Sequence, residues 1–219
     1  MERVKLQTKC EGNKRFCYNL AVLLGGVLLF CSPVTAEVDY ETLKKGVVKI
    51  TTPNETGAGI IVGVESGVTL IVTALHVIAD AKDIQIEFRG KQQPFVGRRF
   101  EKHHEVLDLA VVVVDAPEAK SIVQDLQDFS LGNVETLQLG AEVSAIGHPT
   151  GNDWQVAVLA NRIQALRDPD DSRLFRFTNL SIDRGNSGGP VFDSRGNLIG
   201  MVTRVVPPGH TVAVKSLKS

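Results

Sequence analysis

A glycine-rich stretch, DRGNSGGPVF at residues 183–192, places a serine where it could act as a nucleophile. Serine attacks a carbonyl carbon efficiently only when a neutral imidazole takes its proton, a carboxylate orients that imidazole, and backbone N–H groups face the developing oxyanion. Gly185 and Gly188 can adopt backbone angles that are closed to other residues. We therefore expect the N–H groups of Gly185 and Ser187 to form an oxyanion hole, although the glycines alone also fit an ordinary turn.

Two further residues have the types and positions that this chemistry requires. His76 follows the β-forming run VTLIVTAL at residues 68–75, and a strand end is a rigid place for a catalytic base. Asp108 begins the apolar run DLAVVVV, where a carboxylate can be partly desolvated and accept a hydrogen bond from an imidazole. Taken alone, each would be interpreted as a half-buried histidine or a strand-start aspartate. Together with Ser187 they form a candidate triad.

The elements that must position these residues are predicted to be strands. Short apolar runs rich in Val and Ile, among them GVVKI, LAVVVV, EVSAIG and GPVFD, are separated by Gly, Asn, Asp and Pro. Many short strands with turn signals between them indicate an all-β sandwich or barrel. Short helical turns are expected only at HVIADA and AKSIVQDL. The second of these resembles a connection between two halves, which we place at residues 37–125 and 126–219.

Residues 1–36 have the three-part layout of a secretory signal peptide: a basic start, the apolar run LAVLLGGVLLFC at residues 20–31, and small residues before a cut after Ala36. The apolar run is short for a membrane span, which needs roughly 20 residues. An uncleaved membrane anchor is the alternative, and bulky Phe30 argues against lipoprotein cleavage before Cys31. We expect an exported protein, in the periplasm, the extracellular space or an organelle lumen.

Removal of residues 1–36 changes the composition of the remaining domain. Five basic and two acidic residues are lost, so the net charge goes from −1 to −4, and all three cysteines lie in the removed part. A negative domain gives no electrostatic reason to expect nucleic acid as a partner. Without cysteine, it has no disulfide, no thiol nucleophile and no thiolate metal site. Contact with a membrane is expected only through an uncleaved signal.

Other histidines and the tryptophan are given structural roles. Adjacent residues of a strand point to opposite faces, so His103, His104 and Glu105 do not have metal-ligand spacing. His148, in the AIGHPTG turn, is expected to be structural, and Trp154 is expected to pack in the core. No metal site is predicted.

The motifs TALHVI, DLAVVVV and GNSGGPVFD, in the order His, Asp, Ser, resemble those of the trypsin-like (chymotrypsin-fold) serine peptidases. The HtrA/Deg-like group is the most similar, since it has a GxG segment (Gly57 to Gly59 in this chain), an AIGxPxG segment (residues 145–151) and NRGNSGGP, for which this chain has DRGNSGGP. The resemblance implies two six-stranded antiparallel β-barrels with the active site in the cleft between them. It implies no cofactor.

The resemblance also implies a role for each residue. Ser187 would attack the peptide carbonyl, His76 would take the proton and return it to the leaving amine, and Asp108 would orient His76. Polypeptides, unfolded or damaged proteins among them, would be the substrates. The segment before the serine and the strand after it would line the specificity pocket; these substrate-binding residues are Ser181, Ile182, Met201, Val202 and Thr203. Ile182 and Val202 favour a small or aliphatic substrate side chain.

The domain organisation and the activity each have an alternative. HtrA/Deg proteases usually carry a PDZ domain after the protease, and this sequence ends at Ser219; a free-standing or a truncated protease domain would fit, and the oligomeric state is not indicated. A catalytically inactive or latent protease-fold module with a binding or chaperone-like role is the alternative function. An esterase is disfavoured, because its Gly-x-Ser-x-Gly serine precedes the acid and the histidine in the chain.

Overall fold

The structure is a computed structural model that describes residues 38–65, 67–105, 107–115, 129–149, 154 and 184–203 with their side chains, and seven further strand segments by their backbone. The chain divides into two units, residues 1–37 and 38–219. In the first unit, β1 (Asn19–Leu23) pairs antiparallel with β2 (Gly26–Phe30). Within the described residues, no helix is long and apolar enough to cross a membrane. Signal-peptide cleavage stays a prediction.

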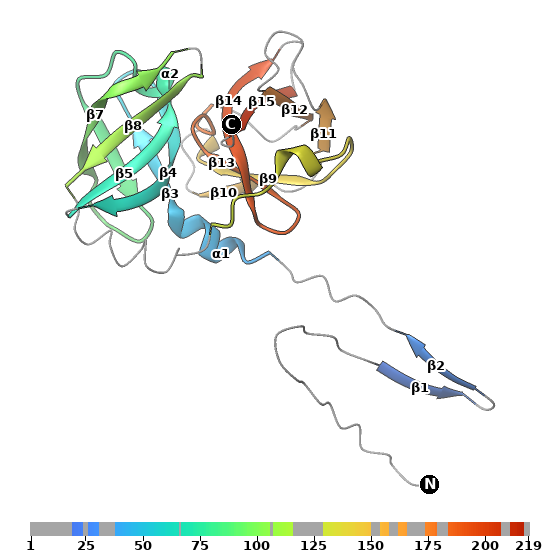
Figure 1. The fold of residues 1–219 in the computed structure, drawn as a ribbon. Coiled ribbons are helices and arrows are strands. Elements are labelled where there is room, and N and C mark those ends of the chain that lie inside the picture. Colours follow the sequence, from blue (N-terminus) through green and yellow to red (C-terminus); the bar gives the residue numbers. More distant parts are fainter. Residues whose placement is uncertain are drawn as a thin grey trace. The chain divides into compact units, whose positions relative to one another are not determined.

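The first half of the second unit is a closed six-stranded barrel with the strand order β3-β4-β5-β8-β7-β6 (Figure 1). Its strands are β3 (Val47–Thr51), β4 (Thr56–Glu65), β5 (Val68–Ala74), β6 (Ile84–Phe88), β7 (Phe95–His104) and β8 (Leu109–Val114). Alternate residues are buried along β6 and β8, as expected for strands with one face on a core. The interior is filled by fully buried aliphatic side chains, including Ile50, Ile60, Ile71 and Val112. The six-stranded barrel predicted for the first half is confirmed.

The second half forms a seven-stranded antiparallel sheet with the order β10-β9-β13-β14-β15-β12-β11. The strands are β9 (Val143–Gly147), β10 (Gln155–Ala157), β11 (Arg162–Ala165), β12 (Leu174–Thr178), β13 (Pro190–Asp193), β14 (Leu198–Val206) and β15 (Thr211–Ser216). The all-β class is therefore confirmed, whereas closure of a second six-stranded barrel stays a prediction. The expected connection AKSIVQDL and the boundary at residue 125 lie outside the described residues.

The larger of two hydrophobic core clusters contains residues from both halves, and the smaller lies within the second half. Ile146, Phe192 and Met201 of the second sheet belong to the same buried cluster as the barrel residues. Phe129, which follows the undescribed connection, stacks on Phe192 with ring centroids 5.7 Å apart. Burial of these side chains fixes the second sheet against the barrel, so residues from both halves can contribute to one site.

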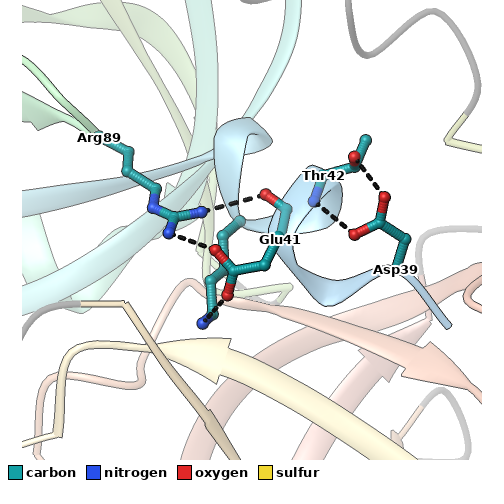
Figure 2. Close-up of polar contacts among 5 residues, drawn as sticks. Asp39, Glu41, Thr42 and Arg89 are labelled. Atoms are coloured by element: carbon teal, nitrogen blue, oxygen red, sulfur yellow. Dashed lines mark hydrogen bonds and ion pairs between the residues drawn. The ribbon is translucent and has the colours of Figure 1, made fainter.

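Among the residues that the structure describes, helical structure is limited to single turns. The predicted turn at HVIADA is α2 (Leu75–Ile78), while α1 (Tyr40–Leu43) and the short 3₁₀ turns η1 (Lys44–Gly46) and η2 (Val134–Thr136) were not predicted. Asp39 caps α1, because its carboxylate accepts bonds from the backbone N–H and the hydroxyl of Thr42 (Figure 2).

Arg89 fixes α1 to the barrel. At the end of β6, its guanidinium donates to the carboxylate of Glu41 at 2.5 Å and to the Glu41 carbonyl at 3.0 Å (Figure 2). On the other side, Val38 and Leu43 lie against Gly196, in the turn between β13 and β14. The segment that follows the predicted signal peptide thus contacts both halves of the fold.

Candidate active site

The pairing of β5 with β8 brings His76 and Asp108 together. Ala74, the last residue of β5, is opposite Leu109, the first residue of β8. His76 lies two residues beyond one strand end, and Asp108 lies one residue before the other. The ladder continues past the strands, since the N–H of Leu75 donates to the Asp108 carbonyl at 3.0 Å. Strand register therefore determines which carboxylate meets the imidazole.

The Asp108 carboxylate holds His76 at two points. One carboxylate oxygen accepts the backbone N–H of His76 at 2.9 Å, and the other lies 2.7 Å from Nδ1 of the ring. An ionised carboxylate can only accept, so Nδ1 carries the proton and the lone pair of a neutral ring is on Nε2. That tautomer leaves Nε2 able to take a proton from a nucleophile. The His76 side chain is 45% exposed, so a substrate can approach it.

Electrostatics around the imidazole favour its charged form. The hydrogen bond that His76 donates to Asp108 raises the pKa of His76 above its ordinary value of 6.5. Partial burial opposes this, and the charges of Asp108 and Glu55 act in the raising direction. A carboxylate that stabilises the imidazolium also makes the neutral ring a better proton acceptor.

The backbone of Asp108 has an unusual conformation, with a φ of 50°. This left-handed conformation is uncommon for a residue other than glycine, although aspartate tolerates it better than most. The N–H of Asp108 donates to the carbonyl of Glu105 at 3.0 Å, which closes a tight turn before β8. The turn directs the carboxylate back toward α2 instead of along the strand.

Ser187 lies in a turn that depends on glycine at two positions. Gly185 has a φ of +99° and Gly188 a φ of +84°, and a Cβ on Gly188 would come within 2.2 Å of the Ala58 carbonyl oxygen. The carbonyl of Ser187 accepts the N–H of Ala58 at 2.8 Å. The serine turn is therefore in contact with β4 of the barrel, across the boundary between the two halves.

Gly57 allows the histidine turn and the serine turn to meet. A Cβ at Gly57 would lie 2.7 Å from a methyl group of Val77 in α2 and 2.9 Å from the carbonyl oxygen of Ser187. A side chain at this position would separate them. The GxG segment thus has a steric role at the site, in addition to its place in β4.

The Ser187 hydroxyl has a partner other than His76. Its oxygen lies 3.4 Å from the carbonyl oxygen of Thr203, to which it donates, and no hydrogen bond joins it to His76 in the part of the chain that the structure describes. An O–H···O distance of 3.4 Å is long for a hydrogen bond, so this contact is weak. The N–H groups of Gly185 and Ser187 donate to no oxygen within that described part, whereas those of Gly188 and Gly189 donate to Val202 and Asn186.

The predicted substrate-binding residues fall into two groups. Ser181 and Ile182 lie outside the described residues. Met201 and Val202 are 0% and 2% exposed and belong to the two core clusters, and Thr203 is 4% exposed. Thr203 offers its carbonyl beside Ser187, whereas the side chains of Met201 and Val202 pack inward. Their assignment to a specificity pocket stays a prediction.

Sequence reasoning missed Thr73 as a component of the site. This residue is fully buried at the end of β5, and its hydroxyl donates to the Ala58 carbonyl at 2.7 Å. A Cβ on Gly188 would lie 2.3 Å from the Thr73 hydroxyl oxygen. A threonine in a β-forming run has the same pattern as any strand residue, so no local signal could have identified it.

In the described part of the chain, the contacts of His103 and His104 are with residues close by in the sequence. Nε2 of His103 lies 3.8 Å from a carboxylate oxygen of Glu105, and Nδ1 of His104 accepts the N–H of Leu107. No group of three or more His, Cys, Asp or Glu side chains that could hold a metal ion occurs among the described residues.

Comparison with known proteins identifies the class. Residues 57–201 match the family model of the trypsin-like peptidase domain. The chain therefore belongs to the trypsin-like peptidase family, a class of serine peptidases. Relatives of the HtrA/DegP type match this chain. A DegP-like periplasmic serine endoprotease of Hahella chejuensis is 30% identical over 68% of this chain and 30% of the relative. The serine protease HhoA of Synechocystis is 32% identical over 68% of this chain and 36% of the relative. The chain spans about a third of the length of these relatives.

Solved structures confirm the chymotrypsin-like fold. A serine endoprotease from Yersinia pestis matches with a TM-score of 0.64 and 24% identity over 82% of this chain and 62% of the other. An inactive form of the Rv3671c protease of Mycobacterium tuberculosis matches with a TM-score of 0.64 and 20% identity. This match covers 84% of this chain and 87% of the other. The expected family resemblance is confirmed by these findings together with the family model.

Proposed function

We propose that this chain is an exported serine endopeptidase that cleaves polypeptides with the triad His76, Asp108 and Ser187. The main support is the pair of hydrogen bonds from His76 to Asp108, one from the backbone N–H and one from Nδ1 of the ring. These bonds leave Nε2 as the basic atom of the imidazole. The contact between Ala58 and Ser187 brings the serine turn to the same end of the barrel. The signal-peptide layout of residues 1–36 supports export, and the periplasmic relatives agree with it.

In the proposed mechanism, Ser187 Oγ forms a bond to the carbonyl carbon of the scissile peptide while its proton moves to Nε2 of His76. The N–H groups of Gly185 and Ser187 stabilise the oxyanion, each contributing roughly 3 kcal/mol to lowering the barrier. The C–N bond then breaks, and the leaving amine takes the proton from His76. Water then attacks the acyl carbon while His76 takes its proton, the bond from that carbon to Ser187 Oγ breaks, and His76 returns the proton to Oγ. Asp108 keeps its negative charge throughout and stabilises the imidazolium.

Attack requires the Ser187 hydroxyl to leave Thr203 and face His76. Because its bond to the Thr203 carbonyl is long at 3.4 Å, rotation about χ1 to another staggered position gives up little interaction energy. Thr203 would then be a resting partner of the nucleophile. Extended segments of unfolded or damaged proteins are the substrates we propose, with a small or aliphatic side chain next to the cleaved bond. We also propose that the seven-stranded sheet closes as the second barrel.

The orientation of the Ser187 hydroxyl also favours a second candidate, a latent or inactive protease-fold module that binds polypeptides. In this alternative, the hydroxyl stays on Thr203 and the triad does not assemble without an activator. The two candidates share the fold and differ in the reactivity of one oxygen atom, so a chemical probe of that atom separates them.

The test is labelling of the purified protein with a fluorophosphonate probe, beside Ser187→Ala and His76→Ala. The proposed function predicts that the wild type is labelled, that both variants fold, and that neither is labelled or digests casein. A folded wild type that is not labelled would favour the latent module. Labelling that persists in Ser187→Ala would show that the nucleophile has been assigned wrongly.

A further inference from the structure

Trp154 joins the loop after β9 to the first barrel. Its indole N–H donates to the carbonyl of Val47, the first residue of β3, at 2.7 Å. Trp154 also packs against the main hydrophobic cluster, and it is the chain's single tryptophan. Trp154 lies between β9 and β10, which are both strands of the second sheet, whereas Val47 is in the first barrel. This bond therefore joins the two halves of the fold.

In the second half of the fold, Trp154 is held by His148, which follows β9. Nδ1 of His148 accepts the backbone N–H of Trp154 at 3.1 Å, and the two rings meet edge to face with centroids 4.8 Å apart. Since Nδ1 is the acceptor, the ring of His148 is in the tautomer opposite to that of His76. The side chain of His148 is completely buried, so this pairing is formed away from water.

The main chain of His148 in turn holds the serine turn. Its N–H donates to the carbonyl of Gly185 at 3.1 Å. A Cβ on Gly185 would lie 1.9 Å from the carbonyl oxygen of His148, so the two backbones are in direct contact. The neighbouring Gly147 is equally close to Asn186, where a Cβ would lie 2.3 Å from the side-chain oxygen. A movement of residues 147 and 148 would therefore displace Gly185.

We propose that Trp154 and His148 are positioning residues for the oxyanion hole. The serine turn is attached to the barrel by two routes that start on neighbouring strands. One is the direct bond from Ala58 on β4 to Ser187, and the other runs from Val47 on β3 through Trp154 and His148 to Gly185. Among the described residues, these two attachments restrain the serine turn relative to the barrel from both sides of Asn186, and so restrain the orientation of the Gly185 and Ser187 N–H groups.

This inference rests on the proposed function, because it assigns a role in forming the oxyanion hole. The expected packing of Trp154 is confirmed, and the inference adds a positioning role to it. Packing alone needs the ring, whereas positioning needs two specific hydrogen bonds: from the indole N–H to Val47 and from the backbone N–H to His148. Substitutions that keep an aromatic ring or a similar size, and remove one hydrogen bond at a time, separate these roles.

The test compares His148→Asn with His148→Leu. The two side chains have similar size, and the Asn oxygen can take the place of Nδ1 as acceptor, whereas Leu has none. Trp154→Phe is the companion variant, since it keeps an aromatic ring and removes the donor to Val47. For each variant and the wild type we would measure the maximal rate of fluorophosphonate labelling, the half-saturating probe concentration and the midpoint of thermal unfolding.

We expect His148→Leu and Trp154→Phe to lower the maximal labelling rate about 10- to 100-fold, as misplacement of catalytic groups does, with the half-saturating concentration within about twofold of the wild type. His148→Asn should retain a rate within about threefold of the wild type, because the acceptor is restored. Rescue by Asn is the result that a purely structural role would not produce. If His148→Leu does not fold, Trp154→Phe against the wild type decides.

Two results would overturn the inference, and they are distinguishable from failure of the proposed function. Equal maximal labelling rates for the wild type, His148→Leu and Trp154→Phe would show that the second attachment does not position the oxyanion hole, while the peptidase assignment stands. Equal loss in His148→Asn and His148→Leu would show that volume, and not the acceptor, matters. Absence of labelling in the folded wild type would instead contradict the proposed function itself.

Discussion

The backbone N–H of Ala58 donates to the carbonyl oxygen of Ser187 at 2.8 Å, and this bond joins the two halves of the chain at the candidate nucleophile. The carbonyl of the same residue, Ala58, accepts the hydroxyl of Thr73 at 2.7 Å. The serine turn is thus attached to β4, and β4 is attached to the end of β5, next to α2. The position of Ser187 relative to His76 depends on this short series of bonds.

Replacement of Gly188 by alanine should disrupt the site for two reasons. At a φ of +84°, any side chain costs about 1–2 kcal/mol, and the added Cβ would lie 2.2 Å from the Ala58 carbonyl oxygen. Gly67→Ala is the matched control, since Gly67 has a φ of +83° and open space around it. We expect Gly67→Ala to lose about 1 kcal/mol of unfolding free energy and to keep full labelling. Gly188→Ala should lose more and should not be labelled. Equal unfolding free energies in urea for the two variants would contradict this account.

Thr73→Val should destabilise the protein more than Thr73→Ser does. Valine keeps the shape of threonine but leaves the buried Ala58 carbonyl without this donor, which costs about 1–3 kcal/mol. Serine keeps the hydroxyl and loses one buried methyl group, which costs about 0.8 kcal/mol. Urea unfolding of both variants measures the difference. A Val variant as stable as the Ser variant would mean that the Thr73 hydroxyl contributes nothing to holding β4.

Asp108→Asn should change both the rate of peptide cleavage and its pH dependence. Loss of the carboxylate permits the wrong tautomer of His76, and the rate should fall about 10⁴-fold. Cleavage needs the neutral imidazole, so wild-type activity should rise with pH through a pKa above 6.5. Since Asp108 is the main cause of that raised pKa, the acidic limb should move to lower pH in the variant. Glu105→Gln, at an exposed carboxylate in the same turn, should leave the profile unchanged. An unmoved acidic limb in Asp108→Asn would assign the titration to another group.

Stability should depend on pH through the same pair. The pKa of His76 is raised in the folded state, so the Asp108–imidazolium interaction stabilises the fold fully below pH 6.5 and is lost as the pH rises through the raised pKa. The difference in unfolding free energy between the wild type and Asp108→Asn should therefore be largest at acidic pH and smaller at alkaline pH. Denaturant titrations at several pH values measure this difference. If it grows with pH instead, the imidazolium is not what Asp108 stabilises in the folded state.

Export should produce a protein that begins at Glu37. A small residue directly before the cut is needed by signal peptidases, so Ala36→Leu should keep residues 1–36 attached, whereas Ala36→Ser should be processed. Mass spectrometry of the protein from a secreting host distinguishes the two forms. Processing of Ala36→Leu at the same bond would refute the assigned cleavage site, and retention of residues 1–36 in the wild type would support an uncleaved anchor.

The candidate site could be proposed from local sequence because each residue type has a specific requirement. Ser187 lies between glycines whose positive φ values the turn needs, His76 follows a β-forming run, and Asp108 precedes another. Short apolar runs rich in Val and Ile, bounded by turn residues, likewise predicted the strands of the first barrel. These features depend on neighbours within a few residues, and they can therefore be predicted from the amino-acid sequence.

Contacts between residues far apart in the sequence depend on how the whole chain folds. The register that places Ala74 opposite Leu109, and hence Asp108 beside His76, depends on pairing between strands far apart in the chain. The bond from Trp154 to Val47 and the burial of Met201 depend on how the second sheet packs against the barrel. Periodicity states which face of a strand is buried, but it carries no information about which strand or carbonyl will lie opposite. That choice is made by the packing of the whole core, where many weak contacts are satisfied together.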